Sequence, residues 1–227
     1  MLLVESLGLI DYPKALEVQE KAVAELISNR NTNLEKLLVC EHPAVITVGR
    51  AAGSREEVLT DKLPVYEVSR GGRSTLHLPG QIVVYPILDL EKRGRDLHSL
   101  MRLLENAIIE TLADFRITAQ SIEGKTGVWV IDESVDANSI TERKIASLGI
   151  AAKKWVSYHG LALNVTCDLK MFSNLSPCGF NSSVMTSMID EMPEEYKKTW
   201  AIEPESLFKN VRLRIIENLK NQLVGEI

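Results

Sequence analysis

The sequence has little of what marks several large classes of protein. Its three cysteines, Cys40, Cys167 and Cys178, are odd in number and show no C-x-x-C spacing, so neither a disulfide framework nor a zinc site is expected. Aromatic residues make up only 5% of the chain, which argues against a stacking platform for single-stranded nucleic acid. The net charge of −5 leaves no general basic field for binding nucleic acid.

Long apolar runs are missing as well. No segment reaches the length of a membrane span, and residues 1–5 have neither the basic region nor the apolar run of a signal peptide. Together with the cysteine pattern, this predicts a soluble, cytoplasmic protein that partners neither nucleic acid nor membrane.

What remains is an ordinary globular composition. The 227 residues are 45% hydrophobic, which is enough for a substantial core. No repeat, low-complexity tract or linker divides them. We therefore expect a single domain of mixed strands and helices over residues 1–227.

The hydrophobic spacing predicts three helices. One begins at Tyr12-Pro13 with Asp11 as its cap, one runs from Asp96 to Phe115, and one is opened by Pro204 as its first residue. Apolar runs and alternation predict strands at residues 2–10, 37–40, 45–48, 65–68, 82–88, 127–131 and 144–150, and a hairpin that turns at His159-Gly160.

The stretch Arg70–Gln81 carries two arginines, a glycine pair and a Pro-Gly turn between predicted strands. A glycine pair allows a ligand to come close to the backbone, and the flanking strands would hold the loop still. The following apolar run, Ile82–Leu88, is typical of a central strand. The alternative interpretation is a hairpin loop with solvated arginines.

Lys144 begins an apolar run, where a lysine is out of pattern. A lysine at the edge of a core can have its pKa lowered by desolvation and can exchange protons. The alternative is a lysine at a strand end that points to water.

Cys178 stands between Pro177 and Gly179. Proline fixes its own φ and glycine tolerates positive φ, so the thiol is expected on a defined turn. A nucleophile is well placed there, because nearby backbone N–H groups can receive developing negative charge. The alternative is an inert, buried thiol.

Two further patterns carry no chemistry in our interpretation. Residues 119–126 end like a phosphate-binding loop, but Ala119 replaces the first glycine and a strand follows. The histidines show no metal-ligand spacing, so each is expected to be structural and no metal is predicted; they are His42, His77, His98 and His159.

Taken together, four stretches resemble the lipoyl(octanoyl) transferases of lipoate biosynthesis. The family pattern R-G-G-x-x-T-Y-H-G-P-G-Q corresponds to Arg70–Gln81, and K-I-A-x-x-G corresponds to Lys144–Gly149. H-G-x-A-L-N-V corresponds to His159–Val165, and P-C-G to Pro177–Gly179. The four occur in family order across most of the chain.

The resemblance implies an α+β fold, a mixed β-sheet with packed helices, similar to the catalytic domain of biotin and lipoate protein ligases. It implies transfer of an octanoyl group from octanoyl-acyl carrier protein to one lysine of a lipoyl domain, the first step of endogenous protein lipoylation. The acceptors would be the lipoyl domains of 2-oxoacid dehydrogenase E2 subunits and the glycine cleavage H protein. No cofactor and no ATP are implied.

The resemblance also assigns roles. Cys178 would carry the acyl group as a thioester, and Lys144 would lower the pKa of that thiol and transfer protons. Small residues would leave room for the acyl chain. The residues implied in substrate binding are Arg70, Gly71, Gly72, Arg73, Ser74, Thr75, Leu76, His77, Ser147, Leu148, Gly149, Gly160, Leu161 and Ala162.

This sequence departs from the family pattern at two positions. Leu76 stands where the family has tyrosine, and Leu78 where it has glycine. If the family's glycine needs a positive φ, Leu78 would strain or reshape the turn, and a leucine there could also alter how the acyl chain fits.

Four other functions stay open. An ATP-dependent lipoate or biotin ligase would need no Cys178. A thiol hydrolase would pair Cys178 with His77 or His159. A non-catalytic binder of acyl carrier or lipoyl domains would form no covalent intermediate. A close variant of the transferase would take octanoyl from another lipoyl domain.

Overall fold

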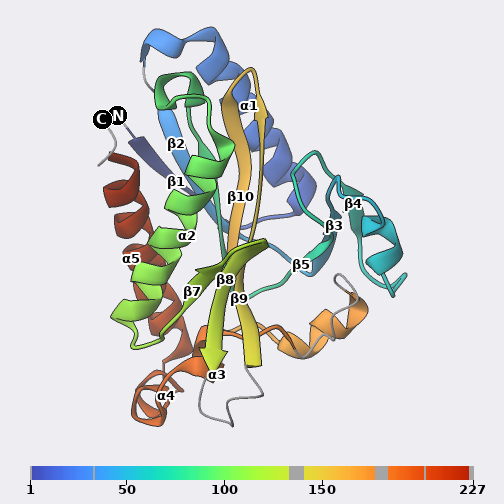
Figure 1. The fold of residues 1–227 in the computed structure, drawn as a ribbon, viewed down its shortest axis with the longest axis vertical. Helices are drawn as coiled ribbons and strands as arrows, with labels where there is room; N and C mark the ends of the chain where they lie inside the picture. Colours follow the sequence, from blue (N-terminus) through green and yellow to red (C-terminus); the bar gives the residue numbers. More distant parts are fainter. Residues whose placement is uncertain (1, 33, 133–140, 177–183, 202, 225–227) are drawn as a thin grey trace.

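The computed structural model describes residues 2–32, 34–132, 141–176, 184–201 and 203–224. Its main feature is a seven-stranded mixed sheet in the order β1-β2-β6-β10-β9-β8-β7 (Figure 1). β1 and β2 are parallel, and every other neighbouring pair is antiparallel. The strands are β1 (Leu2–Leu9), β2 (Glu35–Glu41), β6 (Gln81–Ile87), β7 (Gln120–Ile122), β8 (Lys125–Asp132), β9 (Thr141–Lys153) and β10 (Val156–Asn164).

Helices cover both faces of this sheet. α2 (Leu97–Asp114) and α5 (Pro204–Val224) lie side by side on one face and enclose the larger core with Val84, Leu148 and Leu161 (Figure 1). α1 (Tyr12–Ser28) closes the other face over Val83 and Ala162. The mixed sheet with packed helices confirms the predicted α+β class. The shorter helices are α3 (Met188–Glu191), α4 (Glu194–Ala201), η1 (Arg30–Thr32), η2 (Ser54–Glu57), η3 (Leu90–Arg93) and η4 (Leu169–Asn174).

A second sheet of three strands, in the order β4-β3-β5, lies to one side of the first (Figure 1). The strands are β3 (Val45–Val48), β4 (Val65–Glu67) and β5 (Thr75–His77). Beneath them a third apolar cluster includes Leu76, Leu78 and Phe172. The small sheet therefore holds the segment 68–74 between β4 and β5, here called the arginine-glycine loop, against the large sheet.

The three predicted helices and the central strand β6 are confirmed, including Pro204 at the start of α5. Asp96 caps α2 through its side chain, but Asp11, although it stands at the N-cap of α1, makes no side-chain cap bond.

The predicted turn at His159-Gly160 is wrong. β10 runs straight through both residues, and the chain turns instead at Lys154-Trp155, which have φ values of 49° and 61°. Two successive residues at positive φ form the tight turn that suits the twist of a hairpin. His-Gly resembles a turn in the sequence, but a glycine is needed at position 160 for a different reason. A Cβ there would lie 2.0 Å from the carbonyl oxygen of Val84 on β6, so only glycine lets β10 approach its neighbour.

No helix among the described residues is long and apolar enough to cross a membrane.

Candidate functional site

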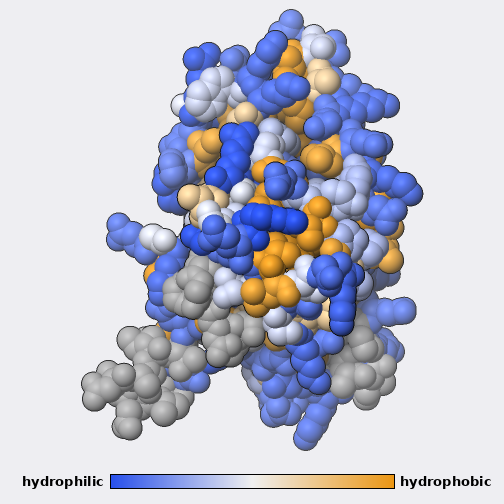
Figure 2. Space-filling view, turned by 90° about the vertical axis from the view of Figure 1, so that its right-hand side faces the viewer, coloured by the Kyte–Doolittle hydropathy of each residue, from blue (hydrophilic) through white to orange (hydrophobic). Residues whose placement is uncertain are grey.

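A cavity of about 320 Å³ opens between the large sheet and the arginine-glycine loop. Its floor is the β9–β10 pair, where Ser147 lies opposite Ala162, Leu148 opposite Leu161 and Gly149 opposite Gly160. Two segments that the sequence places apart are therefore direct neighbours across one ladder. Seen from the side of the small sheet, apolar surface gathers at the middle of this face within a hydrophilic surround (Figure 2).

The structure brings nearly all the predicted site residues together. Gly71 and Leu76 are the exceptions among those it describes, and Cys178 lies outside the described residues. The predicted residues that line the cavity are Arg70, Gly72, Arg73, Ser74, Thr75, His77, Lys144, Ser147, Leu148, Gly149, Gly160, Leu161 and Ala162.

Arg70 is buried, so the alternative of a loop with solvated arginines is wrong for this residue. Its Nη1 donates to the carbonyl oxygens of Gly71 and Arg73 at 3.1 and 2.7 Å, and its Nη2 donates to the carbonyl and Oγ1 of Thr47 at 2.8 and 3.0 Å. The loop is thus folded around the guanidinium. Burial lowers the pKa of Arg70, and the nearby Tyr12 and Tyr85 act against it.

Arg70 fits because two glycines leave it room. A Cβ on Gly149 would lie 3.0 Å from Cδ of Arg70, and one on Gly49 would lie 2.8 Å from Nη1. Arg70 therefore fills the space beside Gly149, and the backbone of β6 fills the space beside Gly160. Both glycines also line the cavity, and the room that they leave for an acyl chain stays a prediction.

The exposed end of the loop is fixed by Glu57, which is buried. Its carboxylate forms an ion pair with Arg73 and accepts a hydrogen bond from the backbone N–H of Ser74 at 2.9 Å. The Ser74 hydroxyl donates to the carbonyl oxygen of Ser54. These contacts join the loop to η2 at the cavity wall.

The two departures from the family pattern strain nothing. Leu78 does not take a positive φ; Gly80 does, at 85°. Leu76 and Leu78 are both buried in the cluster under the small sheet, and neither lines the cavity. The expected strain at this turn is therefore not found.

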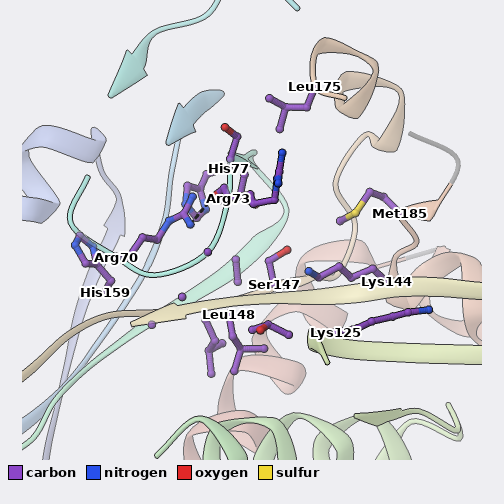
Figure 3. A pocket seen from close by; sticks show the side chains of 18 of the residues that line it. Arg70, Arg73, His77, Lys125, Lys144, Ser147, Leu148, His159, Leu175 and Met185 are labelled. Atoms are coloured by element: carbon purple, nitrogen blue, oxygen red, sulfur yellow. Dashed lines mark hydrogen bonds between the residues drawn. The ribbon is translucent and has the colours of Figure 1, made fainter. Parts of the chain in front are cut away.

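Aromatic and imidazole rings gather at one end of the cavity. Tyr12 stacks on His77 with ring centroids 5.9 Å apart, and its hydroxyl lies 3.4 Å from Nδ1 of His159. The Tyr85 hydroxyl lies 2.7 Å from Nε2 of His42, and these two rings lie in the same cluster. Figure 3 shows His159, Arg70 and His77 following one another toward the middle of the cavity.

Burial keeps these rings uncharged. It raises the pKa of Tyr12 to about 12 and lowers the pKa of His159 to about 4, with the cations of Arg70 and Arg50 adding to the fall for the histidine. Burial also holds the pKa of His77 well below its ordinary value, helped by His42 and Arg70. Two buried atoms that face this region have no hydrogen-bond partner among the described residues, Nδ1 of His77 and Nε of Arg70.

Lys144 stands at the other end. It is half-buried and lines the cavity rather than pointing away to solvent from a strand end. Figure 3 shows its nitrogen directed toward Ser147. Nζ lies 5.3 Å from the ring centroid of Trp129, close enough for a cation–π contact.

Several further residues line the cavity. Gly124, Lys125 and Thr126 belong to the stretch that ends like a phosphate-binding loop; a strand does begin at Lys125, so that motif was rightly rejected, yet the residues line the cavity. The other lining residues carry no motif in the sequence, and only the tertiary fold brings them to the cavity; they include Tyr12, Tyr85, Trp129, Phe172, Leu175, Val184 and Met185.

Within the described part of the chain, no group of three or more histidine, cysteine or acidic side chains is arranged to hold a metal ion. His42 and His159 each have polar partners within the fold, and His98 is exposed.

Comparison with known proteins identifies the family to which this chain belongs. Residues 11–203 match the model of the lipoyl protein ligase A/B catalytic domain. The octanoyltransferase of Geobacter sp. (strain M21) is 41% identical over 86% of this chain and 88% of its own length. The octanoyltransferase of Cytophaga hutchinsonii is 40% identical over 84% and 83%. The chain therefore belongs to the lipoyl protein ligase A/B catalytic-domain family.

Solved structures agree on the fold. A putative lipoate protein ligase from Thermoplasma acidophilum with bound lipoic acid superposes with a TM-score of 0.63 at 16% identity, covering 97% of this chain and 85% of that one. A lipoate-protein ligase A bound with ATP gives 0.64 at 19% identity, covering 98% and 84%. The fold is that of the lipoate protein ligases.

Proposed function

We propose that residues 1–227 form one catalytic domain that takes an octanoyl group from octanoyl-acyl carrier protein, holds it as a thioester on Cys178, and delivers it to a lysine of a lipoyl domain. The chain is an acyltransferase that moves octanoyl groups in protein lipoylation, as its relatives' names indicate. The donor, the thioester and the particular acceptors, lipoyl domains of 2-oxoacid dehydrogenase E2 subunits and the glycine cleavage H protein, are our proposal. A cytoplasmic location likewise stays a prediction from the cysteine pattern.

One observation carries the proposal: a single cavity joins Lys144 to all three predicted binding segments. Its volume of about 320 Å³ lies within the range of about 300–1,000 Å³ usual for small-molecule sites. The wall combines apolar side chains such as Leu161 and Leu175 with polar and charged ones such as Arg70 and Lys144, which suits an acyl chain that carries one polar end.

The chemistry balances without ATP. The Cys178 thiolate attacks the carbonyl carbon of the donor thioester and a new C–S bond forms. The carrier thiolate leaves and takes a proton from the Lys144 ammonium. The amine of the acceptor lysine then attacks the acyl-enzyme, an amide bond forms and the C–S bond to Cys178 breaks. The amine gives its proton to the neutral Lys144, which restores the thiolate–ammonium pair.

Nε of Arg70 is a buried donor without a partner among the described residues, and it lies at the end of the cavity away from Lys144 (Figure 3). The acyl carbonyl must lie near Lys144 for the proton transfers above to occur. We therefore expect the acyl chain to run from the Lys144 end along Leu148 and Leu161 toward Arg70.

The thiol-hydrolase alternative finds little support in the histidines. A general base works best with a pKa near the working pH. His159, with a pKa of about 4, is a weak base at neutral pH, and burial depresses His77 in the same direction. Neither is tuned to activate a thiol.

The test is intact mass spectrometry of the purified protein with octanoyl-acyl carrier protein and no ATP, before and after an apo lipoyl domain is added. We expect an octanoyl adduct on the peptide that contains Cys178, which then moves to the acceptor. The thiols of Cys40 and Cys167 are buried with pKa values of about 12, so they should stay unmodified.

Two variants sharpen this test. Cys178→Ser should abolish the adduct and lower transfer by about 10³-fold or more, while the control Cys167→Ser should form the adduct normally. Transfer by Cys178→Ser that depends on ATP and free acid would favour a ligase instead. Release of free octanoate without an acceptor would favour a hydrolase.

A further inference from the structure

Gly127, in β8, leaves the space that the end of the Lys144 side chain fills. Gly127 has a φ of +126°, and a Cβ there would lie 2.5 Å from Cε and 3.2 Å from Nζ of Lys144. It would also lie 2.7 Å from the carbonyl oxygen of Ala146. Carbon atoms in contact are normally about 3.5–4.0 Å apart. Any other residue at this position would therefore push the lysine out of its place.

The peptide of Gly127 is itself anchored by Glu105 of α2. The Gly127 N–H donates to Oε1 of Glu105 at 3.2 Å. Glu105 is half-buried: burial raises the pKa of its carboxyl, and the Gly127 N–H and the charge of Lys144 act in the opposite direction. One glycine thus touches the lysine and is bonded to a carboxylate that attracts the lysine's charge.

Trp129 is the third residue that contacts the end of the Lys144 side chain. Its ring centroid lies 5.3 Å from Nζ of Lys144 and 5.8 Å from Nζ of Lys125. Its own Nε1 donates to the carbonyl oxygen of Lys125 at 3.1 Å, which fixes the ring. Figure 3 shows the nitrogens of the two lysines pointing in opposite directions, that of Lys144 toward the interior of the cavity.

We propose that Gly127, Glu105 and Trp129 are positioning residues that hold the charged end of Lys144 at the cavity. Gly127 gives it room, Glu105 holds the Gly127 peptide in place and supplies negative charge, and the face of Trp129 supports the cation. The consequence for catalysis rests on the function proposed above, whereas the placement of the lysine does not.

The charged groups around Lys144 determine whether replacing Glu105 should raise or lower the pKa of the lysine. Glu105 approaches from α2, where Arg102 acts on the same carboxylate. Lys125 shares the Trp129 ring and forms an ion pair with Glu142 of β9. The charge of Lys125 is met by Glu142, and loss of the Glu105 carboxylate should make the Lys144 ammonium easier to deprotonate.

The first experiment replaces Glu105 by Gln, which keeps an acceptor for the Gly127 N–H and removes the charge. Labelling of Lys144 by an amine-selective reagent is followed against pH by peptide mass spectrometry, because only the neutral amine reacts. We expect the midpoint to fall by about half a unit to one unit. Glu110→Gln removes the same charge from an exposed position of α2 and should leave the midpoint unchanged. Equal midpoints in all three proteins would overturn the role of Glu105.

The second experiment compares Gly127→Ala with Gly94→Ala. Both glycines have positive φ, but a Cβ on Gly94 would meet nothing within 4 Å, so the control carries backbone strain without a clash. Among correctly folded molecules, Gly127→Ala should change the labelling of Lys144 at fixed pH and lower octanoyl transfer by about tenfold or more. Gly94→Ala should do neither. If labelling in Gly127→Ala matches that in Gly94→Ala, the placement by Gly127 is wrong.

The two proposals fail separately. If Lys144→Arg transfers octanoyl at the normal rate, the proposed catalytic role of Lys144 is overturned. The positioning by Gly127 and Glu105 is then still decided by the labelling of Lys144 in the two sets of variants.

Discussion

His159 combines a backbone φ of 58° with an imidazole that stays neutral in the folded chain. Its backbone N–H donates to Oε1 of Gln19 at 2.8 Å, and its ring lies between the hydroxyls of Tyr12 and Ser69. A residue other than glycine keeps a left-handed conformation inside a strand only when its surroundings over-determine it. The bonds on both sides of His159 provide this.

The depressed pKa of His159 makes stability depend on pH. The folded state takes up the proton near pH 4, and the unfolded state near 6.5. Between these values the unfolded chain binds more protons, so the free energy of unfolding falls as the pH is lowered, by about 3 kcal/mol at most from this residue. His77 and His42, whose pKa values are also lowered, act in the same direction.

We therefore predict that His159→Asn loses less stability than the parent between pH 6.5 and 4, by about 1–3 kcal/mol. Asparagine is chosen because it tolerates positive φ. Urea unfolding at a series of pH values measures the difference, and His98→Asn, at an exposed position, should keep the parent's slope. An unchanged slope in His159→Asn would show that this imidazole does not carry the effect.

At the scale of elements, two aspartates stand at equivalent positions and act differently. The side chain of Asp96 accepts hydrogen bonds from the N–H groups of His98 and Ser99 at 2.8 and 3.0 Å, while Asp11 makes no such bond and pairs instead with Lys14. Capping bonds satisfy N–H groups that a helix start leaves open. Only α2 gains this from its aspartate.

We predict that Asp96→Ala lowers the thermal midpoint by about 2–4 °C and that Asp11→Ala leaves it nearly unchanged. Calorimetry of the two variants and the parent in one buffer compares them directly. Equal shifts would mean that the cap bond of Asp96 contributes nothing beyond the charge at a helix start.

Local pattern predicted most of these elements, because α2 and β6 bury a continuous apolar face. It failed where a contact between distant residues determines the residue type. Gly160 is needed because β10 approaches Val84 closely, not because the chain turns there. The same limit applies to the site. The binding segments carry sequence motifs, but Trp129 looks like a core residue until β8 and β9 pair and bring Lys144 onto its ring. The predicted nucleophile Cys178 lies outside the described residues and stays a prediction.

On the scale of the whole molecule, the cavity should set the acyl length. Leu148 lies both in the main core cluster and on the cavity wall, and Leu163 lies in the same cluster without lining the cavity. Replacing either leucine by alanine removes the same buried side-chain atoms and lowers the free energy of unfolding by about 2–5 kcal/mol. Only the first change should enlarge the acyl site.

We predict that Leu148→Ala shifts the ratio of kcat/KM for longer over octanoyl donors by about tenfold or more, and that Leu163→Ala leaves it unchanged. Competition between acyl carriers of two chain lengths, read by mass spectrometry of the acceptor, measures the ratio. The same shift in both variants would indicate a general loosening of the core and no acyl contact at Leu148.

The order of strands in the large sheet also decides when during synthesis the acyl site can exist. β10 joins two sets of strands, pairing with β6 through Leu161 and Val84 and with β9 through Gly160 and Gly149. Until β10 leaves the ribosome, β6 presents an unpaired edge, the kind of surface on which nascent chains associate wrongly. A chain interrupted just before Val156 already carries the arginine loop and Lys144, and it still lacks the floor on which an acyl group would lie.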